Sequence, residues 1–98
     1  MRITKAVLDA KCENVNRLLG FNPDEITWKT EGSIVVEGAY DGCRVSIRTG
    51  QHGSTSPIGS HTYGPNRDAA LILDGFREAL LLIRSGDIKS PAVVEPRA

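Results

Sequence analysis

The sequence has 98 residues, with 12 basic and 12 acidic side chains, and 40% of its residues are hydrophobic. A chain of this length can bury enough surface for one hydrophobic core, so we expect one small domain. The balanced charge excludes the broad positive field that gives many proteins non-specific affinity for DNA or RNA.

The charges are also spread evenly along most of the chain. The first 20 residues carry four basic and two acidic side chains. Residues 21–32 carry one basic side chain, Lys29, against three acidic ones, Asp24, Glu25 and Glu31. Because no segment contains a basic cluster, the sequence disfavours a nucleic-acid partner.

Two further features bear on location. No apolar run reaches the roughly 18 to 20 residues that cross a bilayer, and the first residues do not resemble a signal peptide. Cys12 and Cys43 lack the spacing of a zinc knuckle or of a disulfide framework. We therefore expect a cytoplasmic protein with reduced thiols and no membrane association.

Residues 4–19 predict an amphipathic helix, because apolar side chains recur at the spacing of one helix face. These are Leu8, Cys12, Val15 and Leu19. Thr4 is a suitable N-cap, and Gly20 is placed to end the helix in a left-handed conformation. A turn is expected at residues 22–24.

Residues 26–50 have a period of two, which predicts a three-stranded antiparallel meander. Asp41-Gly42 is typical of a two-residue type I′ hairpin, which would pair Tyr40 with Cys43. A three-residue turn at 30–32 would add a first strand with Ile26 and Trp28 on the core side.

Residues 49–64 contain four glycines and both histidines, and they predict a long loop with a short strand near 61–63. The next helix should begin at Pro65 or Asn66, with Gly64 or Asn66 as its cap, and end at Ser85 before Gly86. Residues 1–86 would form the domain, and residues 87–98 an extended or disordered tail.

The resulting fold class is α+β, in the order α-β-β-β-α, with both helices on one face of the sheet. One face of the second helix is apolar, as a helix covering a sheet requires. This face comprises Ala69, Ile72, Leu73, Phe76, Ala79, Leu80 and Ile83.

Leu71, Gly75 and Leu82 lie together on the opposite side of that helix. Glycine inside a helix costs about 1 kcal/mol relative to alanine, and it permits close approach of another backbone. Either the loop or the tail covers this face, or two copies of the chain meet there. We favour the second arrangement, a symmetric homodimer or larger oligomer.

The long loop and the start of the second helix have the ingredients of an anion site: backbone N–H groups, hydroxyls and a positive helix end. The candidate residues for a nucleotide-like ligand are Gly50, His52, Gly53, Ser54, Thr55, His61, Asn66 and Arg67. The lysine of a Walker A motif is missing, and a merely flexible loop is the alternative.

The same loop gives little support for catalysis or metal binding. His52 and His61 are nine residues apart, with Cys43 before them, and this spacing matches no common metal site. No nucleophile motif or orienting acid accompanies the histidines. We predict no metal, no cofactor and no catalytic residue, with a small hydrolase that uses the loop histidines as an alternative.

A second alternative is a nucleic-acid binder similar to double-stranded-RNA-binding domains, which share this order of elements. Those domains carry a lysine cluster at the start of the second helix. Residues 64–70 of this chain contain only Arg67, directly followed by Asp68. The order of elements agrees with such a domain, but the charges do not.

Residues 16–20, the hairpin at 38–43, the glycine-rich loop and the last helix together resemble small uncharacterised proteins of bacteriophages and prophages. Such proteins often have a Gly-Ala-Tyr-Gly-Gly hairpin, from which this chain departs at Asp41. The resemblance follows the order of residues 4–86 and transfers no functional residue. It implies a non-catalytic accessory module that binds a host protein, or sequesters a nucleotide-like ligand, in the host cytoplasm.

Overall fold

The computed structural model describes residues 2–50, 52–59 and 62–86. The elements are α1 (Lys5–Leu18), the short 3-10 helix η1 (Pro23–Glu25), β1 (Ile34–Ala39), β2 (Gly42–Arg48), β3 (Thr55–Pro57) and α2 (Asn66–Ser85). The strands form one antiparallel sheet in the order β1-β2-β3. The α+β fold and its order of elements are therefore as predicted, whereas the predicted tail at 87–98 lies outside the described residues.

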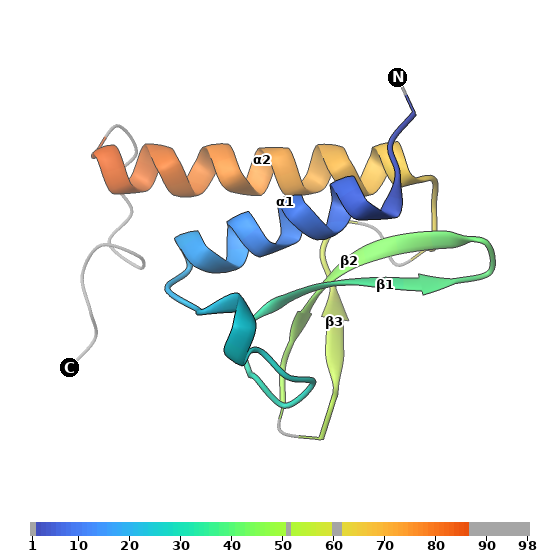
Figure 1. Cartoon of the computed structure of the whole chain (residues 1–98), viewed down its shortest axis with the longest axis horizontal. Helices are drawn as coiled ribbons and strands as arrows, with labels where there is room; N and C mark the ends of the chain where they lie inside the picture. Colours follow the sequence, from blue (N-terminus) through green and yellow to red (C-terminus); the bar gives the residue numbers. More distant parts are fainter. Residues whose placement is uncertain (1, 51, 60–61, 87–98) are drawn as a thin grey trace.

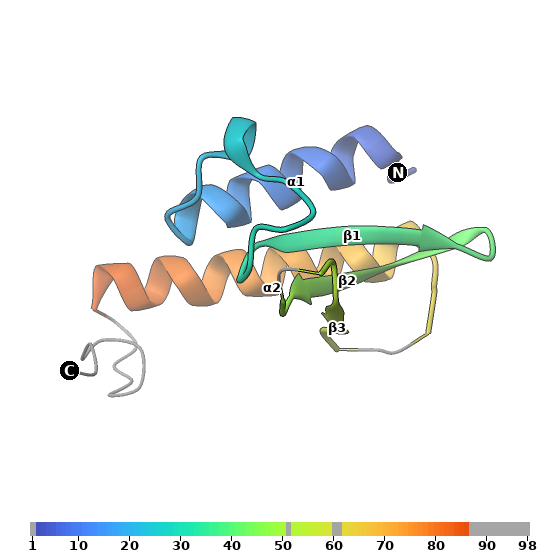
Figure 2. The same ribbon diagram turned by 90° about the horizontal axis from the view of Figure 1, so that it is seen from below.

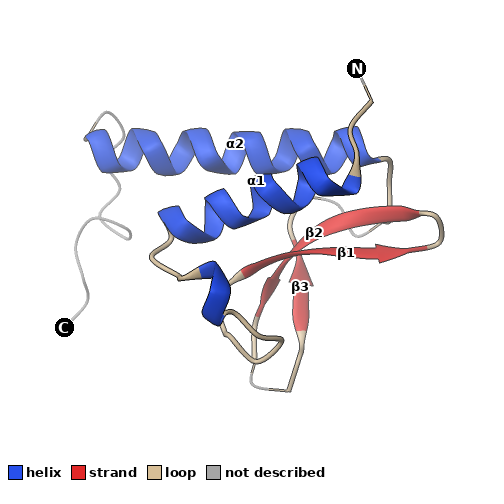
Figure 3. Ribbon diagram, viewed as in Figure 1, coloured by secondary structure: helices blue, strands red, loops and turns tan. Residues whose placement is uncertain are grey.

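The two helices form one layer and the strands form the other (Figure 1, Figure 3). In the view from below, the sheet lies in front of the helix layer, and β1 runs along the line between the two helices (Figure 2). Buried residues from both layers make the core: Leu8, Val15, Ile34, Cys43, Val45, Ala69, Ala70 and Leu73. Among the described residues, neither helix is both long and apolar enough to span a lipid bilayer.

Helix α1 is capped at both predicted positions. The Thr4 hydroxyl accepts a hydrogen bond from the Val7 N–H at 3.3 Å. At the other end Gly20 has a φ of +99°, and the Phe21 N–H donates to the Asn16 carbonyl at 2.9 Å. Glycine adopts this left-handed conformation without strain, so the chain turns sharply there.

Helix α2 ends as predicted at Gly86, which has a φ of +86°, but its N-cap is Pro65 rather than Gly64 or Asn66. The Asn66 amide instead donates to the Ile3 carbonyl at 2.8 Å. This bond joins the starts of the two helices, which run side by side in the same direction (Figure 1).

The β1–β2 turn differs from the predicted Asp41-Gly42 turn by one residue. Tyr40 and Asp41 occupy it, both with positive φ, and Ala39 pairs with Gly42. The reason lies in a distant contact, because a Cβ on Gly42 would lie 2.9 Å from the Gly64 carbonyl oxygen. Gly42 is therefore required inside the strand. Compared with the predicted register, each residue of β1 pairs with a residue two positions earlier in β2. Because side chains alternate between the faces of a strand, a shift of two leaves every side chain on the same face.

The predicted first strand is wrong, since residues 26–32 form turns, and the third strand comes from the predicted loop as β3. Within the turns, the Thr27 N–H donates to the Thr30 hydroxyl at 2.9 Å, and the Thr30 N–H donates to the Thr27 carbonyl at 3.0 Å. Such local bonds compete with pairing in a sheet. As a result Trp28, predicted on the core side, is 57% exposed.

The strand predicted near 61–63 is also misplaced, because β3 occupies Thr55–Pro57. Further on, Gly64 forms an isolated bridge with Cys43. This bridge holds the segment before α2 against the first residues of β2.

The edge of β1 is held by a buried amide from α1. Asn16 is 4% exposed. Its Oδ1 accepts a hydrogen bond from the Ile34 N–H at 2.7 Å, and its Nδ2 donates to the Ile34 carbonyl at 3.0 Å. The Cys12 thiol donates to the same carbonyl at 3.2 Å. These side chains satisfy backbone groups that an edge strand would otherwise leave unpaired.

Candidate functional site

The outward side of α2 exposes leucines as well as charged side chains. Leu71 is 69% exposed and Leu82 is 38% exposed, whereas Ala69, Ala70 and Leu73 are buried on the opposite side. We call the surface formed by Leu71, Gly75 and Leu82 the α2 back face. Nothing in the described part of the chain covers it, so α2 has more apolar surface than its own core uses.

Gly75 has no structural role among the described contacts. A Cβ at this position would meet no atom within 4 Å, and its backbone is helical rather than left-handed. Gly42, by contrast, lies against the backbone of Gly64. Glycine weakens a helix interior, and no contact among the described residues explains why it stands at position 75.

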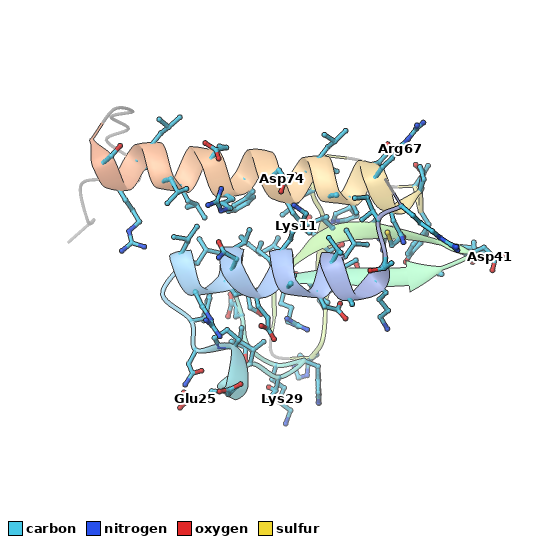
Figure 4. The ribbon with its side chains drawn as sticks, turned by 45° about the horizontal axis from the view of Figure 1, so that its top comes forward. Lys11, Glu25, Lys29, Asp41, Arg67 and Asp74 are labelled. Atoms are coloured by element: carbon cyan, nitrogen blue, oxygen red, sulfur yellow. The ribbon has the colours of Figure 1, made fainter. Side chains whose placement is uncertain are left out.

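Charged side chains near the α2 back face are mostly paired. The Lys11 ammonium contacts Asp74 at 2.6 Å and joins the two helices, as Figure 4 shows. Arg77 contacts Glu78 at 3.1 Å. Arg67 contacts Asp68 at 3.8 Å, although its side chain is 81% exposed.

The predicted ligand-binding residues fall into two separate groups. Gly50, His52, Gly53 and Ser54 belong to the turn between β2 and β3, which is closed by a bond from the Thr49 N–H to the Ser54 carbonyl at 2.9 Å.

The second group lies at the other end of β2. Asn66 Oδ1 accepts a hydrogen bond from the Cys43 thiol at 3.3 Å, and Arg67 follows in the first turn of α2. Between Cys43 and Arg48 the strand advances roughly 17 Å. The structure therefore does not bring the turn and the helix start together (Figure 1), and His61 lies outside the described residues.

Thr55 belongs to a polar network on the outer face of the sheet. Its hydroxyl donates to both oxygens of Glu37, each at 3.2 Å, and the Arg44 Nε contacts Glu37 at 3.4 Å. Burial raises the pKa of Glu37, but the nearby hydroxyls of Ser46 and Thr55 and the charge of Arg44 lower it by more. The net pKa is below the ordinary value, so the carboxylate is charged at neutral pH.

A cavity of about 40 Å³ lies at the start of α2. It is lined by Cys43, Arg44, Thr62, Gly64, Asp68, Ala69 and Ile72. Pockets for small organic ligands usually exceed about 300 Å³, so this cavity has room for little more than a water molecule. It is too small for a nucleotide.

The cysteines are not activated for chemistry. Burial raises the pKa of the Cys12 thiol, and burial followed by the charge of Asp68 raises that of Cys43. Both thiols are free and protonated at neutral pH, which makes them poor nucleophiles. In the described residues no three His, Cys, Asp or Glu side chains are placed to hold a metal ion.

Sequence reasoning missed the exposure of Trp28, which lies against the β2–β3 turn. A Cβ on Gly53 would lie 3.1 Å from Cε3 of the indole ring, and the Lys29 ammonium lies 4.9 Å from the ring centroid. We call Trp28, Lys29 and Gly53 the Trp28 surface. Thr27 and Thr30, three residues apart, were the signal in the sequence for a turn here.

A second aromatic group lies at the opposite end of β2. Tyr40, predicted to pair with Cys43, lies in the turn instead and is 91% exposed. Its ring meets that of Tyr63 edge to face at 5.7 Å. The Arg44 guanidinium lies 4.5 Å from the centroid of Tyr63. The two ends of the sheet thus each present an exposed aromatic side chain.

Comparison with known proteins gave no match: no family model, curated protein or solved structure is significantly similar to the chain.

Proposed function

We propose that this chain is a small non-catalytic binding module that assembles as a homodimer through the α2 back face. One observation carries the proposal: Leu71 and Leu82 are exposed on either side of a glycine that no contact within the described chain explains. Exposed apolar surface of this kind is typical of protein interfaces.

A two-fold axis that pairs antiparallel α2 helices suits this surface. If Leu71 of one copy meets Leu82 of the second, each dimer contains this contact twice. The same register places Gly75 opposite Glu78, where the missing side chain leaves space for the glutamate stem. Arg67 then lies beside the last turn of the second helix, whose free carbonyls favour a positive charge.

Two observations support binding rather than catalysis. The thiols are kept protonated by burial, and the predicted loop residues lie in separate places rather than around one pocket. Following the resemblance to phage proteins, we propose that the partner of the assembled module is a host protein. The separation of the loop residues gives no support to sequestration of a nucleotide.

Sedimentation equilibrium at micromolar concentrations tests the dimer. We expect the wild-type protein to have twice the monomer mass, and Leu71→Glu and Leu82→Glu to have the monomer mass. Val7→Glu is the matched control, because Val7 on α1 is also 38% exposed, and it should stay dimeric. A monomeric wild type, or equal dissociation by Val7→Glu, would overturn the proposal.

Gly75→Ala gives a second, independent readout. Alanine should strengthen the helix by up to about 1 kcal/mol in the unfolding free energy of a monomeric variant, because its Cβ meets nothing. In the dimer the added methyl group should weaken association. An unchanged dimerisation constant would show that the second copy does not pack against Gly75.

A further inference from the structure

The single tryptophan of the chain is presented to solvent on an ordered turn. Trp28 occupies a central position of the turn at residues 27–30, and both threonines that flank the turn bind its backbone groups. The Thr27 hydroxyl accepts from the Lys29 N–H at 3.2 Å. The turn is therefore held in one conformation, although more than half of the indole surface is exposed.

The turn is also fixed to the sheet. The Ser33 hydroxyl donates to the Thr30 carbonyl at 2.6 Å and accepts from the Arg48 guanidinium at 2.8 Å. The Gly32 N–H donates to the Arg48 carbonyl at 2.7 Å. A ligand that contacts Trp28 would thus meet a surface whose order has been established by folding, which lowers the entropic cost of binding.

The indole ring already attracts a cation. The Lys29 ammonium, attached to the next residue, lies within about 5 Å of the ring centroid, in the range of a cation–π interaction. This contact is exposed to water on a flexible side chain. A cation supplied by another molecule, above all the planar guanidinium of arginine, can take the same place.

The surrounding charge favours such a ligand. Asp24, Glu25 and Glu31 are exposed, and within the described residues none of them forms an ion pair. Glu25 and Lys29 lie at the same end of the molecule (Figure 4). Residues 21–32 carry these three acidic side chains against Lys29 alone. Arg48 of β2 lies beside the segment, where its guanidinium donates to the Ser33 hydroxyl at 2.8 Å.

We propose that the Trp28 surface binds a basic, arginine-containing polypeptide segment. One arginine replaces Lys29 over the indole ring, and the carboxylates of Asp24, Glu25 and Glu31 attract the remaining cationic groups. This inference goes beyond the proposed dimer, because it concerns residues 24–31 and not α2. The displaced Lys29 side chain moves into solvent, so binding requires no change of the backbone.

Fluorescence anisotropy of a labelled nona-arginine peptide, titrated with the full-length protein, tests this proposal. We expect saturable binding that weakens as salt is raised, because exposed charges are screened. Nona-glutamate and single-stranded DNA should not bind. The absence of saturable nona-arginine binding, or equal binding of either anionic probe, would overturn the proposal.

Substitutions then locate the site. Trp28→Ala should weaken binding about tenfold and Trp28→Phe by less, because the smaller ring has the weaker cation–π interaction. Lys29→Met should strengthen binding, since it frees the ring and removes a like charge. Tyr40→Ala, which removes an exposed aromatic ring at the opposite end of β2, is the matched control. Equal losses in Trp28→Ala and Tyr40→Ala would contradict the assignment.

The acidic residues are tested as a group. The triple variant Asp24→Asn, Glu25→Gln, Glu31→Gln should bind nona-arginine more weakly and with less dependence on salt. Its control neutralises three exposed acids elsewhere: Asp9→Asn, Glu13→Gln and Asp41→Asn. If both triple variants lose the same affinity, binding reflects overall charge and the proposed site is wrong. Circular dichroism verifies the fold of each variant.

Discussion

The two helices of this small protein use their amphipathic sequences differently. Helix α1 turns one apolar stripe and a polar side chain, Asn16, toward the core, and the buried amide is matched by two bonds to Ile34. Helix α2 turns one apolar face toward the core and a second, formed by Leu71, Gly75 and Leu82, away from it. The buried polar residue is explained by its bonds within the chain, whereas no contact among the described residues explains the exposed leucines.

The largest effect is expected when two leucines of α2 are compared, one on the buried face and one on the exposed face. Leu73 is 1% exposed, so Leu73→Ala should lower the unfolding free energy by about 3 kcal/mol through lost burial and a cavity. Leu71→Ala should lower it by no more than about 0.5 kcal/mol. Urea denaturation in a Leu82→Glu background excludes any contribution from self-association. If Leu71→Ala greatly lowered the unfolding free energy in this background, the chain itself would cover the α2 back face.

The corresponding test on α1 compares two asparagines. Asn16→Ala should cost about 2 kcal/mol of unfolding free energy, because it leaves the Ile34 N–H and carbonyl with fewer partners in a buried place. Asn14→Ala, at an exposed position of the same helix, should change it little. If the two variants were equally stable in urea, the amide would not be what holds the edge of β1 to α1.

The smallest expected effect concerns Glu37 on the outer face of the sheet. Its pKa is lower in the folded state than in the unfolded chain, so the charged form stabilises the fold above the ordinary glutamate pKa of about 4.3. This contribution is lost as the pH falls through the folded-state pKa. As the pH is lowered from neutral to acidic, the melting temperature should therefore fall less for Glu37→Gln than for wild type. An equal fall in both proteins would contradict a stabilising role for the Glu37 carboxylate.

The helices could be predicted from the sequence because their signals are local. Thr4, Gly20 and Gly86 mark three of the four helix ends within a few residues of chain, and the spacing of apolar residues gives the buried faces. The strands depended on contacts between distant residues. The approach of Gly42 to Gly64 has no local signature, so the hairpin turn was misplaced. The first strand was misplaced because the period of two outweighed the local turn signal of Thr27 and Thr30.

The candidate site residues also divide into those that local signals predict and those whose position depends on distant contacts. The α2 back face could be found from helical periodicity, and the structure places its three residues on one exposed side. The loop residues could not be grouped from sequence, since their separation depends on which of them enter β3. Thr55 became part of a strand and the residues before it part of a tight turn, which left Asn66 and Arg67 at the far end of β2.

The one-residue displacement of the β1–β2 turn has a consequence for folding. Apart from Tyr40, which leaves the strand, the Asp41-Gly42 turn and the observed Tyr40-Asp41 turn place the same side chains on the same faces. The alternation of faces along the two strands therefore does not distinguish the two turns. The choice depends on Gly42 reaching Gly64, 22 residues later in the chain. The pairing of the hairpin is therefore coupled to the docking of the segment that precedes α2 on the sheet.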